Sequence, residues 1–230
     1  HSDRGPGLEV GLRILGQVAA LVAHIARIRR GGPELRPVAG ASLAELVLAG
    51  LLAGAPRPEQ VELLDLLWVL YADHGMDAPT FTSMIVASCR ADPYYNVVAG
   101  LSALRGERQG GATERVLELL LSLDDADHAR RRVRELLRAN ERLPGFGHRV
   151  YRRPDPRAAL LRRRASELCA RLGCEPLFEI AHAIEQEAGP PLSRRGVFIN
   201  INFYAAVLFH VLGADGPLIP CLYAVARTAG

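Results

Sequence analysis

A glycine-rich segment over residues 143–157 holds the side chains best suited to binding an anion. Gly145 and Gly147 permit backbone conformations that are closed to other residues, so the segment presents His148 from a tight turn. The arginines that follow the histidine are Arg149, Arg152, Arg153 and Arg157. A histidine donor beside guanidinium groups suits a carboxylate or a phosphate. The residue types alone leave a solvated basic loop open as the alternative.

The remaining histidines outside the polar breaks give weaker signals. Spacing permits a metal at His182, which lies near Glu179 and Glu185 on a predicted helix. The Glu-x-x-His pair has no second copy, which a di-metal helical bundle requires, so we expect no metal site. The isolated histidines that we interpret as core or surface residues are His24, His128 and His210.

Helical periodicity dominates the segments that must position these residues. The apolar residues between positions 12 and 26 repeat at intervals of three and four, and period-two alternation is almost absent. Further helices are predicted at 43–52, 59–70, within 80–103, and at 114–122, 127–140, 157–172, 179–187, 203–212 and 218–227. Asp155-Pro156 marks a helix start, and residues 130–138 are expected to form a solvated basic face with acidic partners. The pattern predicts an all-α fold.

The composition limits the class of protein. The chain has 230 residues, which fits one large domain or a large and a small domain packed together. A formal net charge of +3, with both signs interspersed, is too weak for nucleic-acid binding. No apolar run reaches the roughly 18–20 residues of a membrane span, so neither a nucleic acid nor a membrane is expected as a partner. The four cysteines are scattered without a CxxC pair, which predicts reduced thiols and a cytoplasmic location.

Several blocks of the sequence resemble one family. Leu143-Pro-Gly-Phe-Gly-His-Arg-Val-Tyr-Arg-Arg-Pro-Asp-Pro-Arg157 closely resembles the most diagnostic segment of the citrate synthase family. Leu70–Thr82 looks like the family's His-Ala-Asp-His stretch, and Gly106–Ala112 is similar to its Gly-Pro-Leu-His-Gly-Gly-Ala loop. Asn200–Tyr204 resembles Asn-Val-Asp-Phe-Tyr, and Ala224–Arg227 looks like the last inner-site arginine segment. The blocks follow the family order from about residue 10 to the end.

The resemblance implies roles for single residues. His74, His148, Arg157 and Arg227 would hold an oxaloacetate-like 2-oxoacid, in a site without a metal. His148 would polarise the ketone, while Arg157 and Arg227 would grip carboxylates. The co-substrate would be a coenzyme A thioester. The groups that would face its phosphates and adenine are Arg152 and the backbone from Leu143 to Gly145.

The sequence departs from the family at the two positions that form the enol. The histidine that donates to the thioester oxygen is Gln109, and the aspartate that removes the methyl proton is Asn202. A glutamine still donates one hydrogen bond to an oxyanion, but Asn202 cannot act as a carboxylate base. A general base contributes typically about 10²–10⁴-fold to a rate. The chain therefore keeps the receptor for the oxoacid and loses the groups that make the carbanion.

The resemblance also implies a citrate synthase-like fold with a large and a smaller helical domain. We place the first part of the large domain at residues 1–111, the small domain at 112–212 and the return to the large domain at 213–230. In the family the small domain closes over the ligands and excludes water. A homodimer is expected, with the apolar faces of residues 12–28 and 63–70 as packing or dimer surface.

The family's usual chain extends well beyond this sequence at both ends. Its final segment carries an arginine into the neighbouring subunit's site. Two readings stay open: a short variant, or a gene product of which this sequence is a part.

Two hypotheses of function follow. The first is a citrate synthase-like acyltransferase that joins acetyl-CoA, or a more acidic acyl donor, to oxaloacetate or a similar 2-oxoacid, with catalysis altered at Gln109 and Asn202. The second is a non-catalytic homologue that acts as a ligand-binding or partner subunit. Both explain why His148, Arg157 and Arg227 are kept, and we favour the first.

Overall fold

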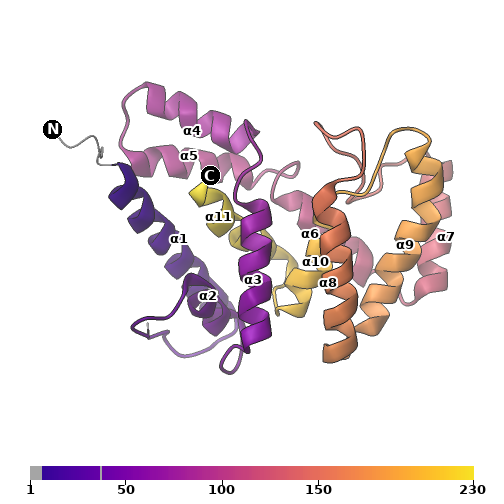
Figure 1. The fold of residues 1–230 in the computed structure, drawn as a ribbon, viewed down its shortest axis with the longest axis horizontal. Helices are drawn as coiled ribbons and strands as arrows, with labels where there is room; N and C mark the ends of the chain where they lie inside the picture. Colours follow the sequence, from indigo (N-terminus) through magenta and orange to yellow (C-terminus); the bar gives the residue numbers. More distant parts are fainter. Residues whose placement is uncertain (1–6, 37) are drawn as a thin grey trace. The chain divides into compact units, whose positions relative to one another are not determined.

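The computed structural model describes residues 7–36 and 38–230 (Figure 1). Its contacts divide the chain into two compact units: unit 1 comprises His1–Gly110 and Pro220–Gly230, and unit 2 comprises Gly111–Ile219. Residues 213–219, which were predicted to belong to the returning segment of the large domain, lie in unit 2, where the short 3-10 helix η1 (Gly216–Leu218) packs against α6.

The described residues form helices and no β-strand, so the all-α prediction is confirmed. The helices of unit 1 are α1 (Gly7–Arg29), α2 (Leu43–Leu51), α3 (Pro58–Tyr71), α4 (Ala78–Ser88), α5 (Pro93–Leu104) and α11 (Ile219–Ala229). Those of unit 2 are α6 (Gly111–Leu121), α7 (Ala126–Arg138), α8 (Pro156–Leu172), α9 (Glu175–Ser193) and α10 (Ile201–Val211), together with η1. Helix α9 runs past the predicted end at residue 187 and through two prolines in its last turns.

Short polar side chains begin many of these helices. Asp77, Asp92, Asp125 and Asp155 each accept a backbone N–H from the first turn of the helix that follows. Such caps satisfy N–H groups that have no partner within the helix. Ser42 caps α2 in the same way, directly before the helix predicted at residues 43–52.

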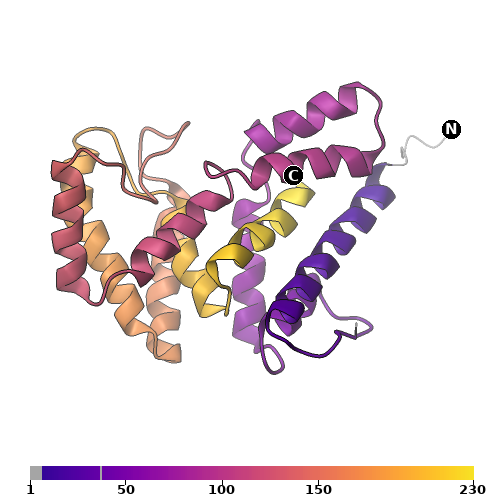
Figure 2. The same ribbon diagram turned by 180° about the vertical axis from the view of Figure 1, so that it is seen from behind.

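Unit 1 is built on close contacts between helix pairs. Helix α1 packs on α2 at Gly50, where an added Cβ would lie 2.2 Å from the carbonyl oxygen of Ala23. Helices α4 and α5 lie side by side (Figure 2), and Gly100 of α5 faces Ser83 of α4. The last helix, α11, is tied to α3 by a hydrogen bond of 3.0 Å from Trp68 Nε1 to the carbonyl of Leu222. Small residues at Gly50 and Gly100 thus set the spacing of these helix pairs.

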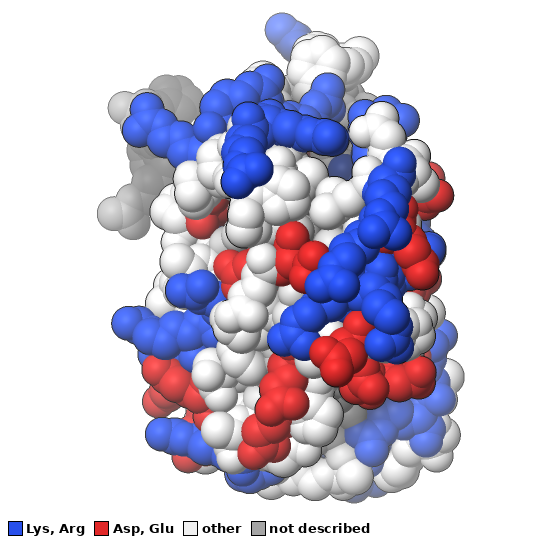
Figure 3. Space-filling model, turned by 90° about the vertical axis from the view of Figure 1, so that its right-hand side faces the viewer, with Lys and Arg blue, Asp and Glu red and all other residues white. Residues whose placement is uncertain are grey.

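Unit 2 encloses α10, whose side chains are almost all buried. Phe203, Tyr204 and Phe209 lie among α6, α8 and α9. On the surface of this unit, arginine and acidic side chains lie next to one another (Figure 3). Arg134 of α7 makes a two-pronged ion pair with Glu187 of α9, at 2.7 and 3.1 Å. The acidic partners expected for the basic face are therefore present.

Helix α1 and the combined stretch of residues 201–211 and 216–229 are long and apolar enough to cross a membrane by length and composition. Helix α10 is buried in unit 2 and has the character of a core helix, whereas α1 packs on α2 with one face and only 22% of its apolar stretch is buried. The opposite side of α1 exposes several large apolar residues, Leu8, Leu12, Leu21, Ile25 and Ile28. The expectation that no membrane is involved stays a prediction.

The cysteines are free thiols. Burial and the neighbouring Cys174 raise the pKa of the Cys169 thiol, which lies in the core of unit 2. The cytoplasmic location expected from the cysteine pattern stays a prediction.

We predict that Gly50→Ala lowers the free energy of unfolding by about 1–3 kcal/mol, because overpacking forces the α1 and α2 backbones apart. Gly16→Ala is the matched control: Gly16 lies in α1 with no atom near its added Cβ. That substitution should raise the stability by about 0.5–1 kcal/mol through helix propensity alone. Urea denaturation followed by circular dichroism measures both changes, and a stabilising Gly50→Ala would contradict the close approach.

Candidate functional site

In unit 2 the glycine-rich loop of residues 143–149 is held by the segment before α10. The Gly147 N–H donates to the Phe198 carbonyl at 2.7 Å, and the Asn200 N–H donates to the Gly145 carbonyl at 2.9 Å. The Asn200 side chain also donates to the Gly147 carbonyl at 2.7 Å, while its oxygen caps α10 by accepting from the Asn202 N–H. One asparagine thus joins the loop of His148 to the start of α10.

The two glycines of this loop have the unusual backbone that the sequence predicted. Gly145 has φ +79° and Gly147 has φ +86°. An added Cβ at Gly145 would lie 2.6 Å from a ring carbon of Phe203, whereas one at Gly147 would meet only Val197 at 3.7 Å. Gly145 is therefore required both for its conformation and for its close approach to the core.

His148 has a fixed ring orientation. Its Nδ1 accepts hydrogen bonds from the backbone N–H groups of Val150 and Tyr151, each at 3.0 Å. A ring nitrogen that accepts two hydrogen bonds carries no proton, so the proton of the neutral imidazole lies on Nε2. The ring also contacts the Tyr151 ring, with centroids 4.5 Å apart. The loop therefore makes Nε2 a hydrogen-bond donor, as polarising a carbonyl requires.

Arg157 lies at the start of α8 and is paired within its own turn. Its Nε and Nη2 donate to the two carboxylate oxygens of Asp155, each at 2.9 Å. The Asp155 side chain is almost fully buried and also accepts the N–H of Ile201 at 3.1 Å. Burial by itself raises the pKa of Asp155, but the hydrogen bonds and charge of Arg157 outweigh it and hold the pKa below its usual value.

Asn202 lies in the first turn of α10 and is half-buried. Its side-chain oxygen accepts a hydrogen bond of 3.0 Å from the hydroxyl of Thr113 on α6. Thr113 itself is buried. At the position where the family that the sequence resembles has an aspartate, this chain thus has a neutral amide that is hydrogen-bonded to Thr113.

The residues expected to meet coenzyme A lie on the same loop of unit 2. Leu143 is buried, and its carbonyl accepts from the Phe146 N–H at 3.3 Å. Arg152 is exposed and donates from Nη1 to the carbonyl of His148 at 3.2 Å. With Arg153 it lines a hollow on the surface of this unit. An exposed guanidinium beside a hollow can reach a phosphate without being desolvated first.

Unit 1 holds the other predicted residues. His74 lies in the turn between α3 and α4, where the Gly75 N–H donates to Asp73 at 2.9 Å. Arg227 of α11 is buried and donates from Nε to the Tyr71 carbonyl at 2.9 Å. Gln109 lies in a separate turn, in which its N–H donates to the Gly106 carbonyl at 2.9 Å.

The structure therefore divides the predicted site residues between the two units. Within unit 2 it joins the segments that carry His148, Arg157 and Asn202. Within unit 1 it joins Arg227 to the segment that carries His74, while Gln109 lies on another turn.

His182 is held by non-metal contacts. Its ring stacks on that of Phe178, with centroids 5.8 Å apart, and its Nε2 lies 2.9 Å from Nε2 of Gln186. Over residues 7–36 and 38–230 no group of three or more His, Cys, Asp or Glu side chains is arranged for a metal ion. The expectation of a site without a metal stays a prediction.

Sequence reasoning missed the acidic partners of the arginines. Asp155 and Asp77 both precede a proline in the first turn of a helix, at Pro156 and Pro79. This pattern indicates a helix cap, but it does not reveal that the second carboxylate oxygen pairs with an arginine. Thr113 gives no signal in the sequence, because its contact with Asn202 depends on how α6 and α10 pack.

Comparison with known proteins gives a consistent result. The family described as "Citrate synthase, C-terminal domain" matches residues 3–230. The citrate synthase of Synechocystis sp. is 33% identical over 95% of this chain and 55% of that protein. Citrate synthase 2 of Bacillus subtilis is 33% identical over 95% of this chain and 58% of that protein. The putative citrate synthase 2 of Mycobacterium tuberculosis is 39% identical over 77% of this chain and 47% of that protein.

Solved structures agree with this result. A ternary complex of carboxymethyl coenzyme A and oxaloacetate with the citrate synthase of Thermoplasma acidophilum matches with a TM-score of 0.90. It is 25% identical, over 96% of this chain and 59% of that one. The citrate synthase of Thermotoga maritima matches with a TM-score of 0.85 at 28% identity, over 96% of this chain and 60% of that one. The chain spans about half to three fifths of the length of these relatives.

We predict that Asp155→Asn lowers the free energy of unfolding by about 3–5 kcal/mol, because it leaves the guanidinium of Arg157 without its buried counter-ion. The exposed pair of Arg130 and Asp127 provides the control, since Asp127→Asn should change stability very little. Chemical denaturation measures both variants.

The loss should depend on pH in a defined direction. A carboxyl whose pKa is lowered on folding stabilises the protein above its unfolded value, about 3.9, and loses this contribution as the pH falls through the folded value. The difference between the wild type and Asp155→Asn should therefore be full at pH 7 and shrink below about pH 4. A difference that stays constant down to pH 2 would contradict the charged pair.

Proposed function

Because the chain belongs to the citrate synthase family, we propose that the protein condenses the acyl group of a coenzyme A thioester with oxaloacetate or a similar 2-oxoacid. The observation that carries the proposal is the loop of His148, whose backbone contacts make Nε2 a donor toward a ketone oxygen. The related enzyme of Thermoplasma acidophilum binds oxaloacetate together with a coenzyme A derivative, which agrees with such a pair of ligands.

The oxoacid would be held by cationic and donor groups. His148 polarises the ketone, and the developing negative charge on its oxygen is stabilised by the Nε2–H. Arg157 and Arg227 bind carboxylates, and His74 contributes a further donor. The rigid contacts at His148 and Arg157 favour catalysis, because donors that are fixed in advance need no reorganisation during the reaction.

The coenzyme A thioester would lie along the loop of residues 143–152. Arg152 is exposed and beside a hollow, so its guanidinium can pair with a phosphate. The backbone from Leu143 to Gly145 provides the surface for the adenine.

The acyl donor would have to be easier to deprotonate than acetyl-CoA. Asn202 supplies no carboxylate, and Gln109 donates a hydrogen bond but supplies no proton. An acyl group with a second electron-withdrawing carbonyl enolises with a weaker base. We therefore propose that such a donor is used in place of, or in preference to, an acetyl group.

A second candidate is a non-catalytic ligand-binding or partner subunit. It is favoured by the loss of proton-transfer groups at Gln109 and Asn202 together, while the oxoacid residues are kept. Calorimetry distinguishes it from the enzyme: a binding subunit takes up oxaloacetate or coenzyme A and yields no new carbon–carbon product by mass spectrometry with any acyl donor.

We also propose that the protein is a homodimer. The pair α4 and α5 exposes large apolar side chains on a single hairpin of unit 1. They are Phe81, Met84, Ile85, Tyr94, Tyr95 and Val98, each at least 42% exposed. A helical hairpin that exposes this many large apolar side chains is typical of an interface.

We predict that Asn202→Asp raises the rate of coenzyme A release from acetyl-CoA and oxaloacetate by about 10²–10⁴-fold, because it restores a carboxylate base. Release of the free thiol is followed with a thiol-reactive dye. Asn140→Asp places the same charge on an exposed residue of unit 2 and should leave the rate unchanged.

The outcomes separate the two candidates. Turnover by the wild type with an activated acyl donor supports the enzyme with a weak base. If neither protein releases coenzyme A with any donor, the condensing function is wrong and the ligand-binding subunit takes its place.

We predict that light scattering finds a particle of twice the 25.0 kDa chain mass, and that Val98→Glu converts it to a monomer. The substitution places a charge within the apolar hairpin, where burial would be costly. Leu121→Glu, on an exposed apolar residue of unit 2, is the control and should leave the dimer intact. A wild type that is monomeric at micromolar concentration would contradict the proposal.

A further inference from the structure

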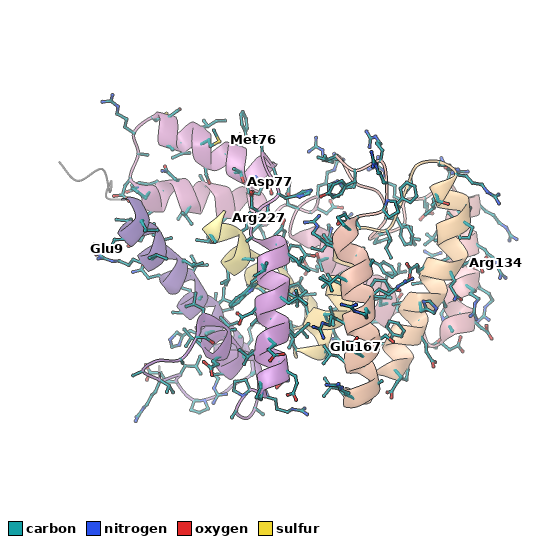
Figure 4. All side chains as sticks on the ribbon, viewed as in Figure 1. Glu9, Met76, Asp77, Arg134, Glu167 and Arg227 are labelled. Carbon is teal, nitrogen blue, oxygen red and sulfur yellow. The ribbon has the colours of Figure 1, made fainter. Side chains whose placement is uncertain are left out.

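Each nitrogen of the Arg227 guanidinium contacts a group of unit 1. Nε donates to the Tyr71 carbonyl at 2.9 Å, and Nη2 donates to the Tyr223 hydroxyl at 2.7 Å. Nη1 forms an ion pair with Asp77 (Figure 4). The guanidinium also lies over the Tyr223 ring, 5.0 Å from its centroid. Since the arginine is only 8% exposed, its charge is compensated inside the protein and not by solvent.

Asp77 divides its two carboxylate oxygens between two tasks. Oδ1 caps α4 by accepting the Thr80 N–H at 3.0 Å, and Oδ2 pairs with Arg227. The capping bond needs an oxygen but no charge, and asparagine and serine cap helices as well as aspartate does. The negative charge of Asp77 is thus used for Arg227 alone.

Burial and the neighbouring acidic charge act on the pKa of Arg227 in opposite directions. Burial lowers the pKa of Arg227, while the nearby charge of Asp73 acts in the opposite direction. A second carboxylate that approached the intact pair would meet a compensated cation and the negative charges of Asp77 and Asp73. Arg227 and Thr80 also line a mostly apolar cavity of about 280 Å³ in unit 1, whose other lining residues come from α4, α5 and the end of the chain.

We propose that Asp77 is a specificity-determining residue of the oxoacid site: its carboxylate occupies the place on Arg227 that a ligand carboxylate must take, so that binding exchanges one carboxylate for another. This inference rests on the proposed function for Arg227 and identifies what a ligand has to displace. A ligand is then bound well only when its carboxylate competes successfully with that of Asp77, which is already desolvated. Anions that interact weakly with Arg227 are therefore disfavoured.

A comparison with Arg157, the second arginine of the predicted site, shows why we assign the exchange to Asp77 and not to Asp155. Both oxygens of Asp155 are fixed by Arg157 and by backbone N–H groups, one of which comes from Ile201 of α10. Displacement of Asp155 would break the contact between two segments of unit 2. Rotation of the Asp77 side chain away from Arg227 would disturb the cap of its own helix α4, but within the described part of the chain no backbone N–H of a second helix donates to Asp77.

The test compares Asp77→Asn with the wild type by calorimetric titration with oxaloacetate. The variant keeps the helix cap and removes the competing charge. We take the Asp77–Arg227 ion pair to be open in about 1–10% of wild-type molecules, a population typical of a minor state. The variant, in which the pair is always open, should then bind oxaloacetate about 10–100-fold more tightly. Asp77→Ser, which also caps a helix, should behave in the same way. Asp92→Asn is the matched control, since Asp92 caps α5 by the same kind of bond and should leave the affinity unchanged.

A second measurement does not depend on the reaction. Asp77→Asn leaves a buried cation without a partner, so it should unfold at a lower temperature than the wild type. Sodium acetate, a minimal carboxylate, should restore part of this loss at concentrations where sodium chloride does not. Acetate should give the wild type no comparable gain.

The outcomes are distinguishable. Tighter binding of oxaloacetate by both Asp77 variants, with Asp92→Asn unchanged, supports the exchange. If the wild type binds oxaloacetate and the Asp77 variants bind it equally or more weakly, the inference is overturned and the proposed function stands. If no variant binds oxaloacetate but acetate rescues Asp77→Asn, the proposed function fails and the exchangeable carboxylate site remains. If acetate has no effect either, both are overturned.

Discussion

The buried carboxylate of Asp155 makes contacts on which the rest of the unit 2 site depends. It caps α8, fixes the guanidinium of Arg157 and accepts the N–H of Ile201 at the start of α10. A carboxylate that is buried so completely is stable only when both of its oxygens accept hydrogen bonds or pair with a cation. The position of Arg157 relative to the first turn of α10 therefore follows from the needs of one acidic group. In the same unit, the side chain of Asn200 fixes the loop of His148 by donating a hydrogen bond to the Gly147 carbonyl.

The two arginines expected to bind carboxylates share a design and differ in its rigidity. Each guanidinium has an internal acidic partner from a helix cap: Asp155 for Arg157 and Asp77 for Arg227. Such pairs allow a cation to be buried in the absence of a ligand. In unit 2 Asp155 accepts backbone hydrogen bonds from both α8 and α10, so its pair with Arg157 is held rigidly. In unit 1 one oxygen is committed to a cap and the other to the arginine alone.

The sequence predicted more of the fold and of the site loops than of the contacts between them. The helical period and the helix starts at Ser42 and Asp155 follow from local rules, and so does the unusual backbone at Gly145. The end of α9 was missed, because Pro190 and Pro191 usually stop a helix, yet here they lie within its last turns. The pairing of Asp77 with Arg227 was missed for another reason. It joins residues 150 positions apart, and no local pattern records which acidic group a distant arginine will meet.

The place of α11 has a consequence for how the protein forms. Unit 2 is a continuous stretch of chain, whereas unit 1 needs residues 220–230 to supply the partners of Trp68 and Tyr71. During synthesis the chain emerges from its N-terminus, and domains generally fold as units. Part of the apolar surface of helices α1–α5 therefore stays uncovered until unit 2 and then α11 have left the ribosome. The helices of unit 1 that precede residue 111 are thus made before unit 2 but gain α11, their last partner, only after it.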